Sequence, residues 1–89
     1  MEKKRNKLEI IRDILLVIKE NKKVGPTRLL HHSNLSPQMF KEYLKLLLHK
    51  KFIEEIISEK KRIFQLTKNG FDFLREYKII EATINNFGL

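Results

Sequence analysis

Two prolines mark the starts of two short helices in this chain. Pro26 and Pro37 each follow a residue that can cap a helix, and each opens a stretch with apolar residues at helical spacing. Proline suits the first position of a helix, because its missing N–H would have no partner there and its fixed φ is already helical. The two helices begin eleven residues apart, so only a short turn can join them. The sequence therefore predicts a helix over 26–32 and another over 37–50.

The turn and the second of these helices carry further signals. Ser33 and Asn34 form the turn, Leu35 is placed to plug it, and Ser36 is a strong N-cap. The apolar residues of the helix that follows obey the i, i+3, i+4, i+7 rule for one buried face. These residues are Phe40, Tyr43, Leu44, Leu47 and Leu48. Two short helices in this relation predict a helix-turn-helix motif.

Helices are also predicted on both sides of this motif. The first is capped by Asn6, with Glu9 completing a capping-box-like start, and it ends at the Lys-rich stretch after Glu20. Its apolar residues form two stripes, which implies that two of its sides are buried. The last helix is capped by Thr67 and is expected over 68–85.

A β-hairpin is predicted before the last helix. Segments 52–57 and 62–66 are rich in β-branched and aromatic residues, and the polar stretch 58–61 separates them. Phe64 and Leu66 should face the core, whereas the first strand carries apolar residues on both faces and its register stays open. The turn contains no glycine, so we expect a tip looser than a tight two-residue turn.

The order of elements is helix, helix, helix, hairpin, helix. This order predicts a mainly α fold with a small β-hairpin wing (α+β), that is, a winged helix-turn-helix plus a long C-terminal helix. A strand-like segment at 23–24 could add a third strand. With 89 residues, the chain is expected to form a single domain over 1–89 with a modest core. Segment 68–87 is expected to be a dimerisation helix.

The charge of the chain is strongly positive and unevenly distributed. Residues 1–70 carry 17 Lys and Arg against 8 Asp and Glu, whereas residues 71–89 carry 2 against 3. Such a surplus favours a polyanionic partner, although it also serves solubility. Without cysteine, the chain has no disulfide or thiolate site, which suits a reducing cytoplasm. The apolar runs are too short to span a bilayer, so no membrane partner is expected.

The outer face of the helix over 37–50 has the chemistry to read DNA. Gln38 can make paired hydrogen bonds to adenine, and Lys41 and Lys45 can reach guanine edges or phosphates. Ser36 can bond a phosphate at the helix N-terminus. Glu42 on the same face could select cytosine or merely repel phosphate. Any solvated helix face could look like this, so a purely structural interpretation stays open.

Further basic residues extend the predicted DNA-binding set. Lys60, Lys61 and Arg62 lie at the hairpin tip, where a wing would meet phosphate or the minor groove. Lysines at hairpin tips also protect sheet edges, and nearby glutamates would repel phosphate unless they point away. Arg28 in the helix over 26–32 completes the set. A basic N-terminal stretch could be a flexible arm or only a solvated terminus. It comprises Lys3, Lys4, Arg5 and Lys7.

The sequence contains no pattern typical of catalysis or metal binding. His31 and His32 are adjacent, so in a helix they point about 100° apart and cannot bind one metal as an i, i+4 pair would. Like His49, they are interpreted as helix-end residues. We therefore expect no enzyme, no cofactor and no metal, and no small-molecule ligand is evident.

An apolar stripe runs along the last predicted helix at spacings of four, three, four and three residues. It comprises Phe73, Tyr77, Ile80, Ile84 and Phe87. A period of 3.5 residues is what a coiled coil requires, so the stripe predicts a homodimer interface. Two heptads are not diagnostic, because the same stripe could pack on the first helix of its own chain.

Several segments together carry a family resemblance. They are Asn34-Leu35-Ser36, Tyr43-Leu44, Leu46-Leu47-Leu48, Phe52-Ile53-Glu54-Glu55 and Leu66-Thr67-Lys68-Asn69-Gly70. The chain resembles the archaeal winged-helix family that includes small chromatin-associated DNA-binding proteins with an antiparallel C-terminal coiled coil. The resemblance implies a homodimeric protein of the archaeal cytoplasm that binds double-stranded DNA. One departure from the family is a short C-terminal helix, which ends near Gly88.

The predicted function is therefore double-stranded DNA binding at the nucleoid, as a transcription regulator or nucleoid-associated protein. The recognition helix is expected over 37–50 and the wing over 52–66. The alternative is a winged-helix protein-interaction module or transcription-machinery subunit that does not bind DNA directly. The basic surplus favours DNA.

Overall fold

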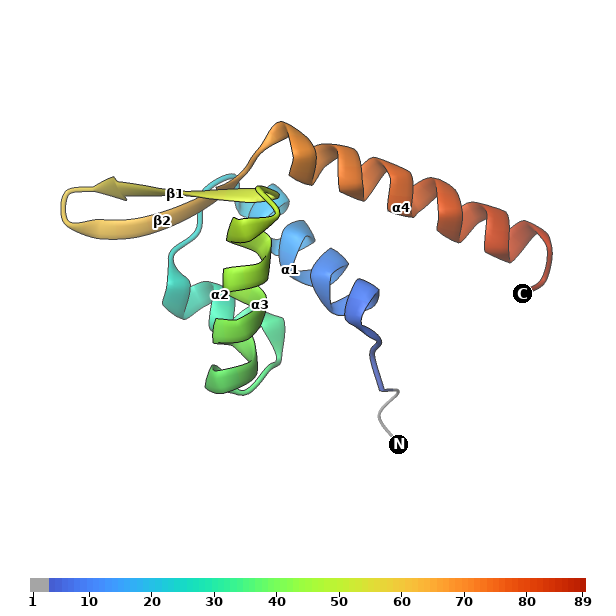
Figure 1. Ribbon diagram of the computed structural model, residues 1–89, viewed down its shortest axis with the longest axis horizontal. Coiled ribbons are helices and arrows are strands. Elements are labelled where there is room, and N and C mark those ends of the chain that lie inside the picture. The colour runs from blue at the N-terminus through green and yellow to red at the C-terminus, as the bar shows by residue number, and fades with distance from the viewer. Residues whose placement is uncertain (1–3) are drawn as a thin grey trace.

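The computed structural model describes residues 4–89 and contains four helices and two strands in that range (Figure 1). In chain order they are α1 (Lys7–Asn21), α2 (Pro26–Ser33), α3 (Pro37–His49), β1 (Ile53–Ser58), β2 (Lys61–Leu66) and α4 (Lys68–Asn86). This confirms the predicted order and the predicted α+β winged helix. The predicted bounds of the elements differ from the observed ones by only one or two residues.

The helices begin where their capping residues predict. In α1 the Asn6 side chain accepts the Glu9 N–H at 2.8 Å, and the Glu9 carboxylate accepts the Asn6 N–H at 3.1 Å. Ser36 and Thr67 each accept an N–H from the third residue of their own helix, both at 3.2 Å. Each contact pairs a backbone donor that the first turn of a helix leaves without an intrahelical partner.

The sheet is an antiparallel pair of β1 and β2, and its register answers the question that the sequence left open. Ile53 pairs with Leu66, and both are buried on the core side together with Phe64. Val24 exchanges two backbone hydrogen bonds with Phe64, at 3.1 and 2.8 Å. The predicted third strand is therefore present as a bridge of one residue.

The hairpin tip corrects one prediction. Ser58 pairs with Lys61, so the turn consists only of Glu59 and Lys60, with φ of 50° and 65°. Positive φ at both central residues is the signature of a type I′ turn, and the expectation of a looser tip was wrong. The twist of a type I′ turn matches that of the strands. This match outweighs the left-handed backbone of two non-glycine residues, which costs about 1–2 kcal/mol each.

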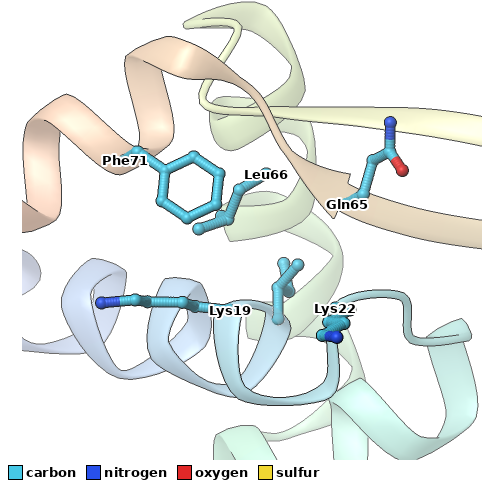
Figure 2. A pocket seen from close by; sticks show the side chains of 6 residues that line it. Lys19, Lys22, Gln65, Leu66 and Phe71 are labelled. Atoms are coloured by element: carbon cyan, nitrogen blue, oxygen red, sulfur yellow. The ribbon is translucent and has the colours of Figure 1, made fainter.

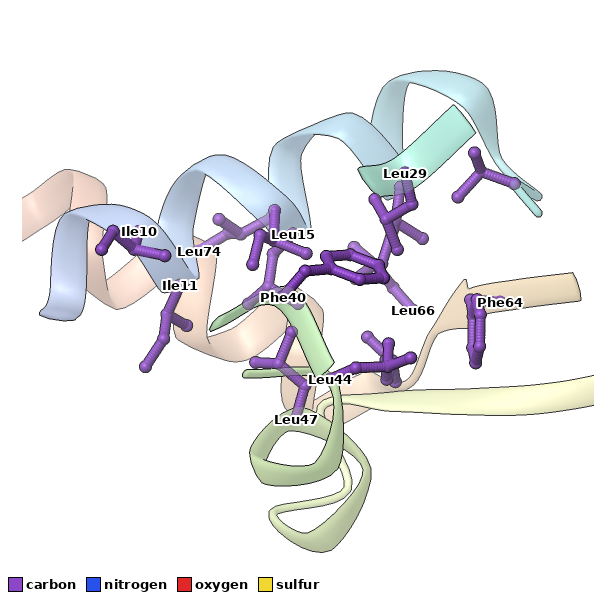
Figure 3. Close-up of a cluster of buried hydrophobic side chains, with 14 residues drawn as sticks. Ile10, Ile11, Leu15, Leu29, Phe40, Leu44, Leu47, Phe64, Leu66 and Leu74 are labelled. Atoms are coloured by element: carbon purple, nitrogen blue, oxygen red, sulfur yellow. The ribbon is translucent and has the colours of Figure 1, made fainter. Parts of the chain in front are cut away.

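The core forms around α1, which contacts α2 and β2 on one side and α4 on the other. Ile14, Leu15 and Ile18 of α1 are completely buried. Figure 3 shows how side chains from α1, α3 and β2 meet in one apolar cluster. The two apolar stripes of α1 thus cover two neighbours, as the sequence predicts.

The buried residues of α4 all lie in its first half. Gly70 and Leu74 are buried, whereas every residue from Lys78 to Leu89 is exposed. The hairpin and the end of α4 point toward opposite ends of the molecule, which measures 49 × 32 × 21 Å (Figure 1). The second half of α4 therefore carries apolar side chains that the rest of the described chain does not cover.

Candidate nucleic-acid interface

One side of α3 is uncovered and polar. The other side is held in the core by Phe40, Leu44 and Leu47. At 100° per residue, four exposed polar residues follow one another along the outer side. They are Gln38, Glu42, Lys45 and His49. Lys41 is also exposed, at the flank of this line. The structure therefore places the predicted Gln38 and Lys45 on one outward face, and it adds His49, which the sequence suggested only as a helix-end residue.

The start of α3 and the exposed side of α2 supply further contacts. Ser36 is exposed, and its side-chain oxygen accepts the N–H of Met39. Its hydroxyl hydrogen remains able to donate to a phosphate at the positive end of the helix dipole. Arg28 is exposed on α2. Both predicted residues thus lie on the surface of the helix-turn-helix.

At the wing, Lys60, Lys61 and Arg62 are all exposed, but Arg62 also bonds other residues of the hairpin. The Arg62 guanidinium donates two hydrogen bonds to the Glu55 carboxylate, at 2.7 and 3.2 Å, and lies 5.3 Å from the centre of the Phe64 ring. The hydrogen bond from Arg62 lowers the pKa of Glu55 below its ordinary value, and the same contact raises the pKa of Arg62. Both groups therefore stay charged and hold each other.

Two of the three glutamates near the wing have partners inside the hairpin. Glu55 pairs with Arg62, and Glu54 accepts a hydrogen bond from the amide of Gln65 on the opposite face of the sheet. Glu59 lies in the turn itself beside Lys60. Among the cations of the tip, Lys60 and Lys61 are therefore the ones without an ion pair to another described residue.

The basic N-terminal stretch does not form a free arm at Arg5. Its guanidinium bonds the Asp13 carboxylate at 3.0 Å and the Ser33 carbonyl oxygen at 2.8 Å. This contact ties the segment before α1 to the C-terminal end of α2, where carbonyl groups attract cations. Lys4 and Lys7 are exposed, and Lys3 lies outside the described residues.

The predicted dimer stripe divides into two parts. Phe73 lies 5.1 Å from the Phe52 ring and 6.0 Å from Tyr77, centre to centre, so the first two residues pack within their own chain. The remaining three residues of the stripe are exposed, with exposed fractions between 41% and 75%. They are Ile80, Ile84 and Phe87. The intrachain interpretation is therefore confirmed for Phe73 and Tyr77, and the dimer interface stays a prediction for the exposed residues.

Arg12 joins α1 to α4, a contact that the sequence analysis missed. Its guanidinium pairs with Asp13 at 2.9 Å and with Glu81 at 2.8 Å, and it lies 5.1 Å from the centre of the Tyr77 ring. Burial works against the charge, but the hydrogen bond and charge of Asp13, with the charges of Tyr77 and Glu81, raise the pKa of Arg12. This permanent cation fixes the direction in which α4 leaves the domain.

Within residues 4–89, no cluster of three or more His, Asp or Glu side chains is arranged to hold a metal ion. None of the helices in the described range is long and apolar enough to cross a membrane.

A family model described as winged helix-turn-helix matches residues 4–85. The chain belongs to this family. Solved structures with the same fold include Sso10a-2, a DNA-binding protein from Sulfolobus solfataricus, with a TM-score of 0.77 and 21% identity over 93% of this chain and 86% of that one. No curated protein sequence matches the chain significantly.

Two further solved structures resemble this winged helix-turn-helix chain. F93 from STIV, a winged-helix DNA-binding protein, matches with a TM-score of 0.72 and 14% identity over 91% of this chain and 95% of that one. SSV1 F-93 matches with a TM-score of 0.68 and 20% identity over 88% and 91%. At these identities the likeness shows the shared fold, which includes the helix after the wing.

Proposed function

We propose that this winged helix-turn-helix protein binds double-stranded DNA as a homodimer, in the cytoplasm at the nucleoid, as a transcription regulator or nucleoid-associated protein. The observation that carries the proposal is the exposed polar line on α3, because the major groove admits an α-helix and presents a distinct pattern for each base pair. Sso10a-2 and F93, which share the fold, are described as DNA-binding proteins. The basic surplus of residues 1–70 supports the same partner.

The exposed residues have separable roles in this proposal. Gln38 reads adenine, and Lys41 and Lys45 bond guanine or phosphate. Ser36 and Arg28 position the motif on the backbone. At the wing, Lys60 and Lys61 contact phosphate or the minor groove, and Arg62 contributes less because Glu55 neutralises its charge.

The exposed half of the α4 stripe forms the interface between two copies in this proposal. Ile80, Ile84 and Phe87 follow Phe73 and Tyr77 on the same helix face, so two stripes can meet along one continuous apolar seam. A two-fold dimer would then present two α3 helices to one duplex, and simultaneous contact would raise the affinity of the pair above that of one head.

A salt series on duplex DNA tests the proposal. If a dimer neutralises about four to eight phosphates, log K against log salt should slope at roughly −4 to −7 by fluorescence anisotropy. Lys60→Ala and Lys61→Ala should weaken binding about equally on all sequences. Gln38→Ala should cost ~1–3 kcal/mol on a preferred site and little on random DNA.

Lys78→Ala is the matched control, because it removes a lysine from exposed α4, away from α3 and the wing. Its affinity should stay close to that of the unchanged protein. Absence of binding to any duplex at low salt would reject the DNA proposal and favour a protein-interaction module. Equal losses for Gln38→Ala on all sequences would reject its reading role.

A further inference from the structure

A pocket of about 240 Å³ lies on a part of the molecule that the proposed DNA contacts do not use. Figure 2 shows it between the C-terminal end of α1 and the point where β2 passes into α4. Its lining residues are Ile18, Lys19, Lys22, Gln65, Leu66 and Phe71. None of them belongs to α3 or to the hairpin tip, so a ligand in the pocket would leave the DNA-reading surface uncovered.

One wall of the pocket is apolar and includes an aromatic ring. Phe71 is half exposed although it lies in the first turns of α4, next to the domain core. Its ring lies against Leu66, above the end of α1 (Figure 2), and Ile18, which also lines the pocket, is completely buried. A flat apolar group placed here would remove the Phe71 ring from water, which is the usual source of affinity in ligand pockets.

The opposite rim is positively charged. Lys19 and Lys22 lie three residues apart at the end of α1, and in the described part of the chain neither has a carboxylate within 4.0 Å. On the sheet side, Gln65 donates its amide hydrogen to the carboxylate of Glu54. The pocket therefore has a cationic side at α1 and an acidic neighbour at the sheet, so an anionic group would turn toward the two lysines.

Lys22 is held in a strained backbone conformation. Its φ is 62° and its ψ is −53°, and the Lys23 N–H donates to the Asn21 carbonyl across it at 2.6 Å. This is the γ-turn with positive φ, which is rare for any residue with a Cβ. Glycine would adopt the same conformation without the steric conflict. A lysine kept in such a position beside a pocket points to a use for its side chain.

We propose that this pocket binds a small organic anion with a flat apolar body, of the class of aromatic carboxylates. The ring packs against Phe71 and Leu66, and the carboxylate accepts charge-assisted hydrogen bonds from Lys19 and Lys22. The inference is independent of the proposed DNA binding, because it uses other residues and another ligand. No pattern in the sequence points to it, since the lining residues come from three elements.

Titration of the full chain with benzoate, benzamide and acetate tests the ligand class. Isothermal calorimetry should give saturable binding of one benzoate per chain, with NMR shifts centred on Phe71 and Leu66. Benzamide keeps the ring without the charge and should bind about tenfold more weakly. Acetate keeps the charge without the ring and should not saturate. The proposal fails if benzoate does not saturate or if benzamide binds as well as benzoate.

Two substitutions separate a ligand role from a structural one. Lys22→Gly removes both the ammonium and the strain, so the protein should melt at a higher temperature while its benzoate affinity drops about tenfold. Phe71→Ala should leave the circular dichroism spectrum unchanged and should also lower the affinity for benzoate. Unchanged benzoate affinity in Lys22→Gly would overturn the proposal.

The matched control is Lys23→Gln, which removes the neighbouring lysine that does not line the pocket. Benzoate should bind this variant as it binds the unchanged chain. If Lys23→Gln weakens benzoate as much as Lys22→Gly does, the anion responds only to the net positive charge of the protein, and the pocket is not its site.

Discussion

At the residue scale, Gly70 occupies a position that has no room for a Cβ. It is buried in the first turn of α4, and a Cβ built there would overlap the carbonyl oxygen of Phe52. That carbonyl already accepts the Thr67 N–H at 3.1 Å, and Thr67 in turn bonds the Lys51 carbonyl. The close approach lets α4 begin directly against the residue that opens the hairpin.

Gly70→Ala should therefore destabilise the fold by about 3 kcal/mol, because the obstacle is backbone and cannot rotate away. Urea unfolding followed by circular dichroism measures the change. Gly25→Ala is the control, since its Cβ would meet the nearest atom, the Arg62 carbonyl oxygen, at an ordinary 3.6 Å. Its free energy of unfolding should change by less than about 1 kcal/mol. Similar losses in both variants would contradict the close-contact explanation.

At the element scale, the hairpin combines a tight turn with cross-strand pairing. The type I′ turn places Lys60 at the end of the wing, and the pair of Arg62 and Glu55 holds the strands just behind it. The turn is formed by residues with poor intrinsic preference for positive φ, so its shape is imposed by the strands. Lys60 thus lowers the local stability of the turn, but it places a cation at the tip.

Substitutions of Lys60 separate the effect of backbone strain from the effect of its charge. Lys60→Gly should raise the free energy of unfolding by about 1 kcal/mol relative to Lys60→Ala, because both remove the same charge and only glycine releases the left-handed strain. Thermal unfolding of the two variants gives the difference. On DNA the two variants should lose the same affinity, because neither carries the ammonium group. Equal stability of the two variants would show that the turn is unstrained.

At the scale of the whole molecule, the two halves of α4 have different roles. The first half packs on the domain through Leu74 and the rings of Phe73 and Tyr77, and just beyond it Glu81 pairs with Arg12 of α1. The second half extends beyond the domain with its apolar residues in water. In the proposed dimer, the rigid first half sets the direction of the arm, and so the separation of the two α3 helices on DNA.

The double substitution Ile80→Glu with Ile84→Glu should abolish the dimer, since it places like charges opposite each other in an apolar seam. Analytical ultracentrifugation should then give a monomer, and its affinity for DNA should fall because the two heads no longer bind together. Ala82→Glu with Asn85→Glu adds the same charge on another side of α4 and should remain a dimer. An unchanged protein that sediments as a monomer at tens of micromolar would contradict the proposed assembly.

The sequence by itself determined the helices and their caps, because these depend on contacts within about four residues, and it indicated the hairpin through two segments rich in β-branched and aromatic residues. Asn6, Ser36 and Thr67 mark the starts of helices, because their side chains accept hydrogen bonds from nearby N–H groups. The spacing of apolar residues indicates which face of each helix is buried. Part of the candidate site was predictable for the same reason. The outer face of α3 is the side opposite the apolar residues that recur at helical spacing and are buried.

Only the tertiary structure decided which charges are held and which remain available. Arg12 meets Glu81, 69 residues away in the chain, and Arg62 closes on Glu55 through the strand register. The turn type at Lys60 and the close approach at Gly70 also depend on how neighbouring elements meet. Such contacts follow from the relative placement of helices and strands, and no local pattern of residues encodes that placement.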